Sequence, residues 1–245
     1  MLNKNIVDYM GCDCTYEEAD IVLYGAPFDS TTSFRPGTRF AGGAIRTDSY
    51  GLELYSPYQD RSLEECRVFD MGDLELAIGS SKKVLDQIEE TAGEIFRDGK
   101  LPFLIGGEHL VTLGSVRAAA RKYPDLHILH FDAHTDLRED YLGVELSHAC
   151  VLRRCWELLG DGRIHQFGIR SGERAEFGWA REGHTDLHPF TLHSRSGCDG
   201  PFRLSRDGNA GGGRRKLYGA AESRDGSVPE GRGHRVRRDR AEPAF

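Results

Sequence analysis

Four side chains of the types that bind divalent metals occur in two short segments of the sequence. One is His109 in the segment GGEH, and the others are Asp132, His134 and Asp136 in FDAHTD. Alternate residues of an extended segment face the same way, so the last three would share one side. Imidazole nitrogens and carboxylate oxygens together suit ions such as Mn²⁺, Zn²⁺ or Fe²⁺. Carboxylates also hold two-metal sites, with the ions ~3.5–4 Å apart. The pattern therefore predicts a metal centre.

A purely structural role is the alternative for any one of these residues. A single histidine near a strand end is more often a hydrogen-bonded polar residue than a ligand, and we interpret His127 and His130 in this way. For the second segment this alternative is weaker, because ionisable groups crowded at one strand end repel or stay unpaired without a cation.

The elements that position these residues follow an alternating pattern. Short apolar runs predict strands at 21–26, 101–105, 126–131 and 163–169. Apolar residues at helical spacing predict one helix from Ser81 to about Gly99 and another over 112–122. Strands that alternate with helices favour an α/β fold with a parallel sheet. His109 follows one strand and Asp132 follows another, so both lie at the carboxyl edge of the sheet, where such folds bind ligands.

Composition excludes some classes of function. Lys and Arg number 32 against 39 Asp and Glu, which gives a formal net charge of −7. An acidic chain is a poor binder of nucleic acid or of an anionic membrane. No apolar run approaches the ~18 residues of a membrane span, and the amino terminus does not resemble a secretory signal. We interpret the six cysteines as reduced thiols and expect a cytoplasmic protein.

The chain changes character near residue 190. Residues 195–245 hold twelve Lys or Arg against seven Asp or Glu, with ten glycines and no isoleucine. Such a composition buries too little apolar surface to offset the entropy of ordering. We therefore predict one partial α/β domain over 1–190 and a disordered Arg/Gly-rich segment over 191–245.

The motifs resemble those of a known family. GGEHLVTLG at 106–114 and HFDAHTDLRED at 130–140 are similar to the first two metal-binding motifs of the ureohydrolases, the arginase and agmatinase family. Residues 25–46 resemble the amino-terminal signature of the agmatinase branch. Residues 147–154 and 168–182 resemble two further agmatinase segments.

This resemblance implies a three-layer α/β/α fold with a mainly parallel sheet and a site for two Mn²⁺ ions. It also implies hydrolysis of a guanidino C–N bond with release of urea, most simply from agmatine to give putrescine. By their places in the motifs, His109 and Asp136 would bind one Mn²⁺, His134 the other, and Asp132 would bridge them. His148 matches a family histidine that transfers a proton or contacts the substrate. The family is usually oligomeric, so we expect a homo-oligomer that binds a small cationic guanidino substrate.

The resemblance stops before the third metal motif of the family, S-x-D-x-D-x-x-D-P. When codons for residues 195–201 are chosen freely and read one base later, they can encode D-L-D-V-M-D. The same frame can go on to P-G-T-G-T-P-E-A-G and then D-V-I-E-L-S-P, which is the family order. We therefore interpret 191–245 as out of frame, with a natural basic tail as the alternative. The fold is then incomplete at its carboxyl end, and we expect little activity from the chain as written.

The substrate and the catalytic competence of the protein each have an alternative interpretation. Arginase, guanidinobutyrase and formimidoylglutamase activities use the same chemistry on other substrates. A catalytically inactive metal-binding remnant is the alternative from a different class.

Overall fold

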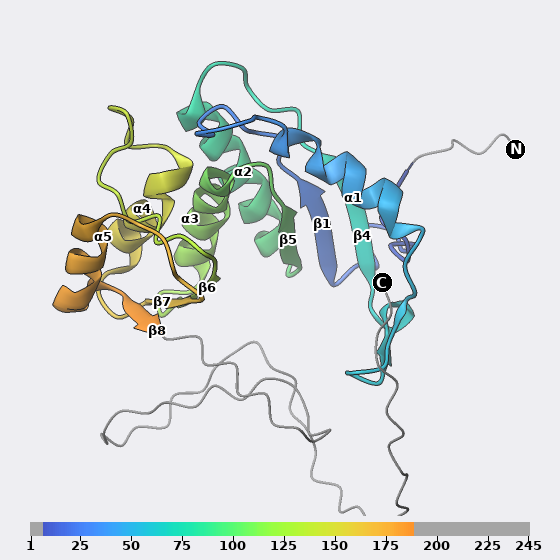
Figure 1. The fold of residues 1–245 in the computed structure, drawn as a ribbon. Coiled ribbons are helices and arrows are strands. Elements are labelled where there is room, and N and C mark those ends of the chain that lie inside the picture. Colours follow the sequence, from blue (N-terminus) through green and yellow to red (C-terminus); the bar gives the residue numbers. More distant parts are fainter. Residues whose placement is uncertain (1–6, 189–245) are drawn as a thin grey trace, which may run out of the picture. The chain divides into compact units, whose positions relative to one another are not determined.

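The structure is a computed structural model that describes residues 7–188 (Figure 1). The segment 191–245, which the sequence predicts to be out of frame and disordered, lies outside the described residues. Strands and helices alternate along much of the chain, as predicted. The strands are β1 (Ile21–Gly25), β2 (Tyr55–Ser56), β3 (Arg61–Ser62), β4 (Val68–Asp73), β5 (Leu101–Ile105), β6 (Ile128–Phe131), β7 (Ile164–Phe167) and β8 (Asp186–His188). The α-helices are α1 (Ala41–Ser49), α2 (Ser81–Arg97), α3 (Thr112–Lys122), α4 (Val151–Leu159) and α5 (Arg174–Trp179).

Two parallel three-stranded sheets form the framework. The first has the strand order β4-β1-β5, and the second has the order β6-β7-β8. Residue Ile21 of β1 pairs with Leu101 of β5, and Ile128 of β6 pairs with Ile164 of β7. The short strands β2 and β3 form a separate antiparallel pair. The predicted α/β class with parallel strands is thus confirmed.

Helices α2, α3 and α4 cover one face of the sheets and form the main core with them. Helix α2 begins after Ser80, whose side chain accepts a hydrogen bond from the backbone N–H of Lys83. Such a cap satisfies one of the helix's unpaired amides. One cluster of buried side chains draws on the sheets and on all three helices, including Tyr24, Ile88 and Leu152. The helices therefore connect the two sheets through a shared apolar layer.

The first sheet also carries a helix on its other face. Successive strand residues point to opposite faces, so Leu23 of β1 and Asp70 of β4 face away from the main core. Asp70 there forms a buried ion pair with Arg46 of α1, with Nε 2.7 Å from Oδ2. The predicted three layers are present at this sheet.

Strands β5 and β6 each leave one edge unpaired among the described residues, and both expose large apolar side chains. Leu101 and Phe103 of β5 are 53% and 56% exposed, and Leu129 and Phe131 of β6 are 47% and 63% exposed. Unpaired edges with exposed apolar side chains invite association. The expectation of a fold that is incomplete at its carboxyl end stays a prediction.

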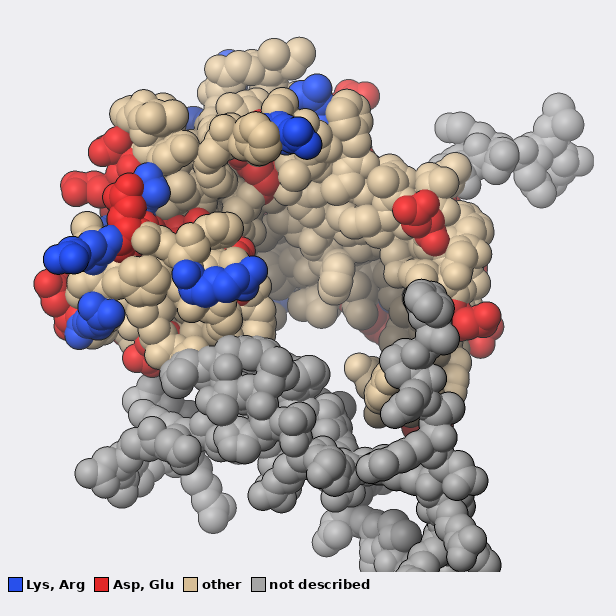
Figure 2. All heavy atoms as spheres, viewed as in Figure 1, with Lys and Arg blue, Asp and Glu red and all other residues tan. Residues whose placement is uncertain are grey.

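Two further observations concern the surface of residues 7–188. None of their helices is long and apolar enough to cross a membrane. Figure 2 shows acidic and basic side chains interspersed over the region of α4 and α5, rather than gathered into one patch of a single sign.

Candidate metal centre

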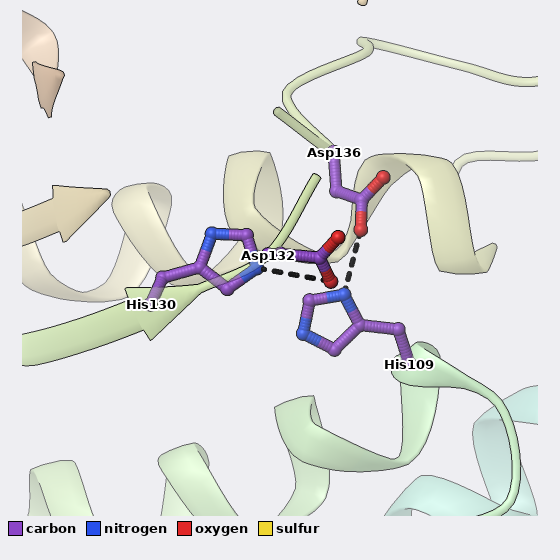
Figure 3. A group of neighbouring side chains, drawn as sticks. All are labelled: His109, His130, Asp132 and Asp136. Carbon is purple, nitrogen blue, oxygen red and sulfur yellow. Dashed lines mark hydrogen bonds and ion pairs between the residues drawn. The ribbon is translucent and has the colours of Figure 1, made fainter. Parts of the chain in front are cut away.

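Two imidazoles and two carboxylates converge where strands β5 and β6 end (Figure 3). They belong to His109, His130, Asp132 and Asp136, and one ligand atom of each lies within 4.8 Å of the others. His109 lies in the single 3₁₀ turn His109–Val111 that follows β5, and the others end β6 or follow it. The carboxyl edge of the sheet is therefore the place where the predicted residues meet.

The segment that leads to His109 depends on a close approach between two backbones. A Cβ atom at Gly107 would lie 2.0 Å from the carbonyl oxygen of Phe28, so glycine alone fits there. The next amide, of Glu108, donates to that same carbonyl at 2.7 Å. These contacts fix the turn that presents His109 to the centre.

Short contacts join the four side chains in pairs. Nδ1 of His109 lies 2.6 Å from Oδ2 of Asp136. Nε2 of His130 lies 3.6 Å from Oδ2 of Asp132. The two imidazoles stack with their centroids 5.1 Å apart. Each histidine is thus paired with one carboxylate, and the two rings are stacked.

Residues from β7 and α5 hold the loop that carries the two aspartates. Glu176 of α5 is buried and accepts hydrogen bonds from Oγ1 of Thr135 at 2.6 Å and from the amide of Leu137 at 3.0 Å. The side chain of Gln166 in β7 donates to the carbonyl of Thr135 at 2.8 Å. Asp136 lies between these anchors in a left-handed conformation, with φ of 49°.

The electrostatics of the centre favour an ionised carboxylate at Asp132 and a neutral imidazole at His130. Burial opposes ionisation of Asp132, but the backbone amide of His134 and the imidazoles of His130 and His109 outweigh it and lower its pKa. Desolvation, with a smaller contribution from His109, lowers the pKa of His130. Deprotonated carboxylate and neutral imidazole are the forms that bind metal ions.

The donor set fits a divalent transition ion. It combines imidazole nitrogen with carboxylate oxygen atoms, and Mn²⁺, Zn²⁺ and Fe²⁺ bind both kinds of ligand. Nε2 of His130 is buried and has no hydrogen-bond partner within the described residues, although such atoms are usually satisfied. An ion near Asp132 would remove this deficit.

His134 and His148, two of the residues predicted from the sequence, lie outside this group of four. The side chain of His134 is 63% exposed, and its Nδ1 lies 3.5 Å from Oδ1 of Asp132. Strand β6 ends at Phe131, so the alternation that would place His134 beside Asp136 does not continue. The role of His134 as a ligand therefore stays a prediction.

A chain of hydrogen bonds connects His148 to the residue that precedes His109. Its amide donates to Oγ1 of Thr31 at 3.1 Å, and that hydroxyl donates to Oε1 of Glu108 at 2.7 Å. Nε2 of His148 lies 2.9 Å from Oγ of Ser33. Burial raises the pKa of Glu108, against the hydrogen bonds from Thr31. The amino-terminal signature thus contacts the predicted catalytic histidine directly.

Sequence reasoning missed His130 as a member of the centre. The structure places it there because β6 is extended up to Phe131, so His130 and Asp132 point toward the same side. The spacing of His130 and Asp132, two residues apart in an extended segment, was the sequence signal that could have indicated this. Gln166 and Glu176, which hold the loop, carried no comparable signal, because their partners are distant in the sequence.

The fold and the site together define a class: a parallel α/β protein with a candidate divalent-metal centre at the carboxyl edge of its strands. Comparison with known proteins adds the family. Residues 19–200 match the Arginase family, and the chain belongs to that family.

Several relatives are named as ureohydrolases or agmatinases. The agmatinase of Bacillus subtilis (strain 168) is 50% identical over 177 residues, which are 72% of this chain and 61% of that protein. The N(1)-aminopropylagmatine ureohydrolase of Thermococcus kodakarensis is 40% identical over 68% of this chain and 56% of its own length. The crystal structure of the agmatine ureohydrolase of Thermoplasma volcanium matches with a TM-score of 0.69 and 37% identity, over 75% of this chain and 61% of that one. The chain thus spans about three fifths of these relatives' length.

Proposed function

We propose that the described residues form the amino-terminal part of a manganese-dependent ureohydrolase that converts agmatine and water to putrescine and urea. The observation that carries this proposal is the convergence of His109, Asp132 and Asp136 at the end of β5 and β6. The 50% identity to an agmatinase supports the choice of substrate. We expect the enzyme to work in the cytoplasm and as a homo-oligomer.

The residues of the centre would have different roles in the reaction. His109, Asp132 and Asp136 would hold the ions, and His134 would complete the set that the family motif implies. Two bound Mn²⁺ ions supply positive charge, which lowers the pKa of a nucleophilic water.

His148 would donate a proton to the amine that leaves. Departure of putrescine requires a proton on its amine, and a positioned imidazole is the usual donor near neutral pH. Nε2 of His148 is held by Ser33, while Nδ1 is buried without a hydrogen-bond partner among the described residues. Thr31 fixes the backbone of His148, so the ring is oriented from two sides.

We also propose that residues 191–245 reflect a shifted reading frame, so that the chain as written is catalytically impaired. The relatives extend well beyond the part that matches this chain. Sequencing the coding DNA across codons 185–200 tests this proposal. One or two bases gained or lost there would support it, and an intact frame would contradict it.

The test of activity compares two proteins. The purified chain as written and the frame-corrected chain are each supplied with Mn²⁺ and agmatine, and urea is measured. We expect urea only from the corrected chain, and none from its His109→Ala variant. Ordinary enzymatic rates from the chain as written would contradict the impaired state.

A substrate panel separates the remaining alternatives. The Thermococcus relative, 40% identical, is named for aminopropylagmatine, so this substrate is the specific second candidate. Arginine, guanidinobutyrate and formiminoglutamate complete the panel. A corrected chain that prefers any of these over agmatine would overturn the agmatinase assignment, and one that cuts none of them would favour an inactive metal-binding remnant.

A further inference from the structure

A second group of metal-binding side chains lies on the second sheet, away from the centre described above. It consists of His165 in β7 with Asp186 and His188 in β8, and one ligand atom of each lies within 4.8 Å of the others. His165 and Asp186 are direct partners in the parallel pairing of the two strands. The group is therefore built on backbone hydrogen bonds rather than on a loop.

These side chains occupy the face of the sheet opposite helix α4. Ile164 packs into the main core with Val151 of α4, and the next residue along the strand, His165, points the other way. His188 stacks on Phe167 with ring centroids 4.5 Å apart, which fixes its place on the same face. Asp186 is more exposed, with 51% of its side chain accessible, so an ion could enter from solvent.

The distances suit a shared small cation. Nδ1 of His165 lies 3.1 Å from Oδ2 of Asp186. Zinc binds imidazole nitrogen and carboxylate oxygen at ~2.0–2.2 Å, so two ligand atoms of a tetrahedral site are roughly 3.3–3.5 Å apart. The imidazole of His188 lies next to that of His165, with ring centroids 5.7 Å apart. Small rotations of these side chains would bring three ligand atoms around one ion.

The other ring nitrogen of His165 already has a hydrogen-bond partner. Its Nε2 lies 3.1 Å from Nδ1 of His127, and the two rings stack at 5.3 Å. Histidine ligands usually direct their second ring nitrogen to a hydrogen-bond partner, which fixes the tautomer and the ring orientation. With Nε2 engaged by His127, Nδ1 faces Asp186.

We propose that His165, Asp186 and His188 bind one Zn²⁺ ion, with His127 as the hydrogen-bond partner that orients His165. Two imidazoles and one carboxylate are a common zinc donor set, and the fourth position would be left to water. A bound ion would connect β8, the last strand of this sheet among the described residues, to β7 by side chains in addition to the backbone. This site is separate from the carboxyl-edge centre, which has other residues and two carboxylates.

The alternative is a hydrogen-bonded cluster that has no affinity for metal. The two are distinguished by titrating Zn²⁺ into the full 245-residue chain by calorimetry, and by titrating Co²⁺, whose visible absorption reports tetrahedral nitrogen and oxygen ligands. The starting protein carries His109→Ala and Asp136→Ala, so that the carboxyl-edge centre does not contribute. We expect this protein to bind one Zn²⁺ at the second group.

Variants of the group then identify its ligands. Adding His165→Ala or His188→Gln should weaken the site by more than about 100-fold, and His127→Ala should weaken it by roughly 10- to 100-fold. His184→Ala is the matched control, because His184 pairs with Asp161 outside the group. Asp186→Asn, which keeps the size of the side chain, serves if a histidine variant fails to fold. The proposal would be overturned if the starting protein bound no Zn²⁺. It would also be overturned if neither His165→Ala nor His188→Gln changed the affinity for Zn²⁺.

Discussion

Nδ1 of His109 and Oδ2 of Asp136 are 2.6 Å apart, and they connect the segments that follow β5 and β6. The first of these strands belongs to one sheet and the second to the other. The candidate metal centre therefore depends on how α2, α3 and α4 hold the two sheets together.

We expect Asp136→Asn to lower the affinity of the chain for Mn²⁺ by at least about 100-fold, because it removes a ligand charge and not merely a supporting hydrogen bond. Electron paramagnetic resonance of free Mn²⁺ during a titration measures this directly. Asp140→Asn is a matched control in the same loop, since Asp140 accepts a local hydrogen bond from the amide of Gly143 and is not a member of the centre. Equal affinities of the two variants would exclude Asp136 as a ligand.

Glu176 should matter for both stability and metal binding. Replacement by alanine leaves Thr135 and the amide of Leu137 without their buried acceptor, which costs about 2 kcal/mol of unfolding free energy. The loop that carries Asp136 should then loosen, and Mn²⁺ affinity should fall as well. Urea denaturation and a metal titration measure the two effects. Glu182→Ala, at an exposed position close by, should change neither, and an unaltered Glu176→Ala protein would refute the anchoring role.

The buried pair of Arg46 and Asp70 should make stability depend on pH. Burial opposes ionisation of Asp70, but hydrogen bonds from Arg46 and from the amides of Gly72 and Tyr9 outweigh it and lower its pKa. A lowered pKa in the folded state contributes stability above the usual value of about 4, and this contribution is lost as the pH falls through the folded value.

Asp70→Asn should therefore cost about 2 kcal/mol at pH 7, because Arg46 loses its buried partner and keeps the partly exposed carboxylate of Asp73. The difference from the unsubstituted chain should begin to shrink below about pH 4, where Asp70 of the unfolded chain becomes protonated. It should go on shrinking as the pH falls toward the lower pKa of the folded state. Urea denaturation between pH 3 and 7 provides the comparison. A difference that stays constant over this range would show that the charge of Asp70 contributes little.

The exposed side chains of the edge strands should promote association of the chain as written. Phe103→Lys and Phe131→Lys place charges on β5 and β6, and charged edges resist pairing with other chains. We expect a smaller weight-average mass by light scattering for the double variant. Ile78→Lys is the control, because Ile78 is fully exposed in a turn between β4 and α2 and belongs to neither edge strand. An equal mass for all proteins would mean that these edges do not drive association.

The sequence by itself predicted four of the strands, the helices α2 and α3, and three of the four residues of the centre, but not the helices α1, α4 and α5. The boundaries predicted for 101–105 and 112–122 are those of β5 and α3, because apolar periodicity and turn residues act over short distances. Strand β4, with the sequence VFDMGD, was not predicted. It is polar in part because Asp70 pairs with Arg46, a partner 24 residues away that no local pattern reveals.

The candidate metal centre was likewise predicted from the sequence only in part. His109, Asp132 and Asp136 were predicted because ligand types at strand ends are a local signal, and the structure brings them together. Only the tertiary structure showed that His130 joins them, and that Glu176 anchors their loop. Local spacing cannot specify such contacts, because they form when packing of distant segments sets the direction of each side chain.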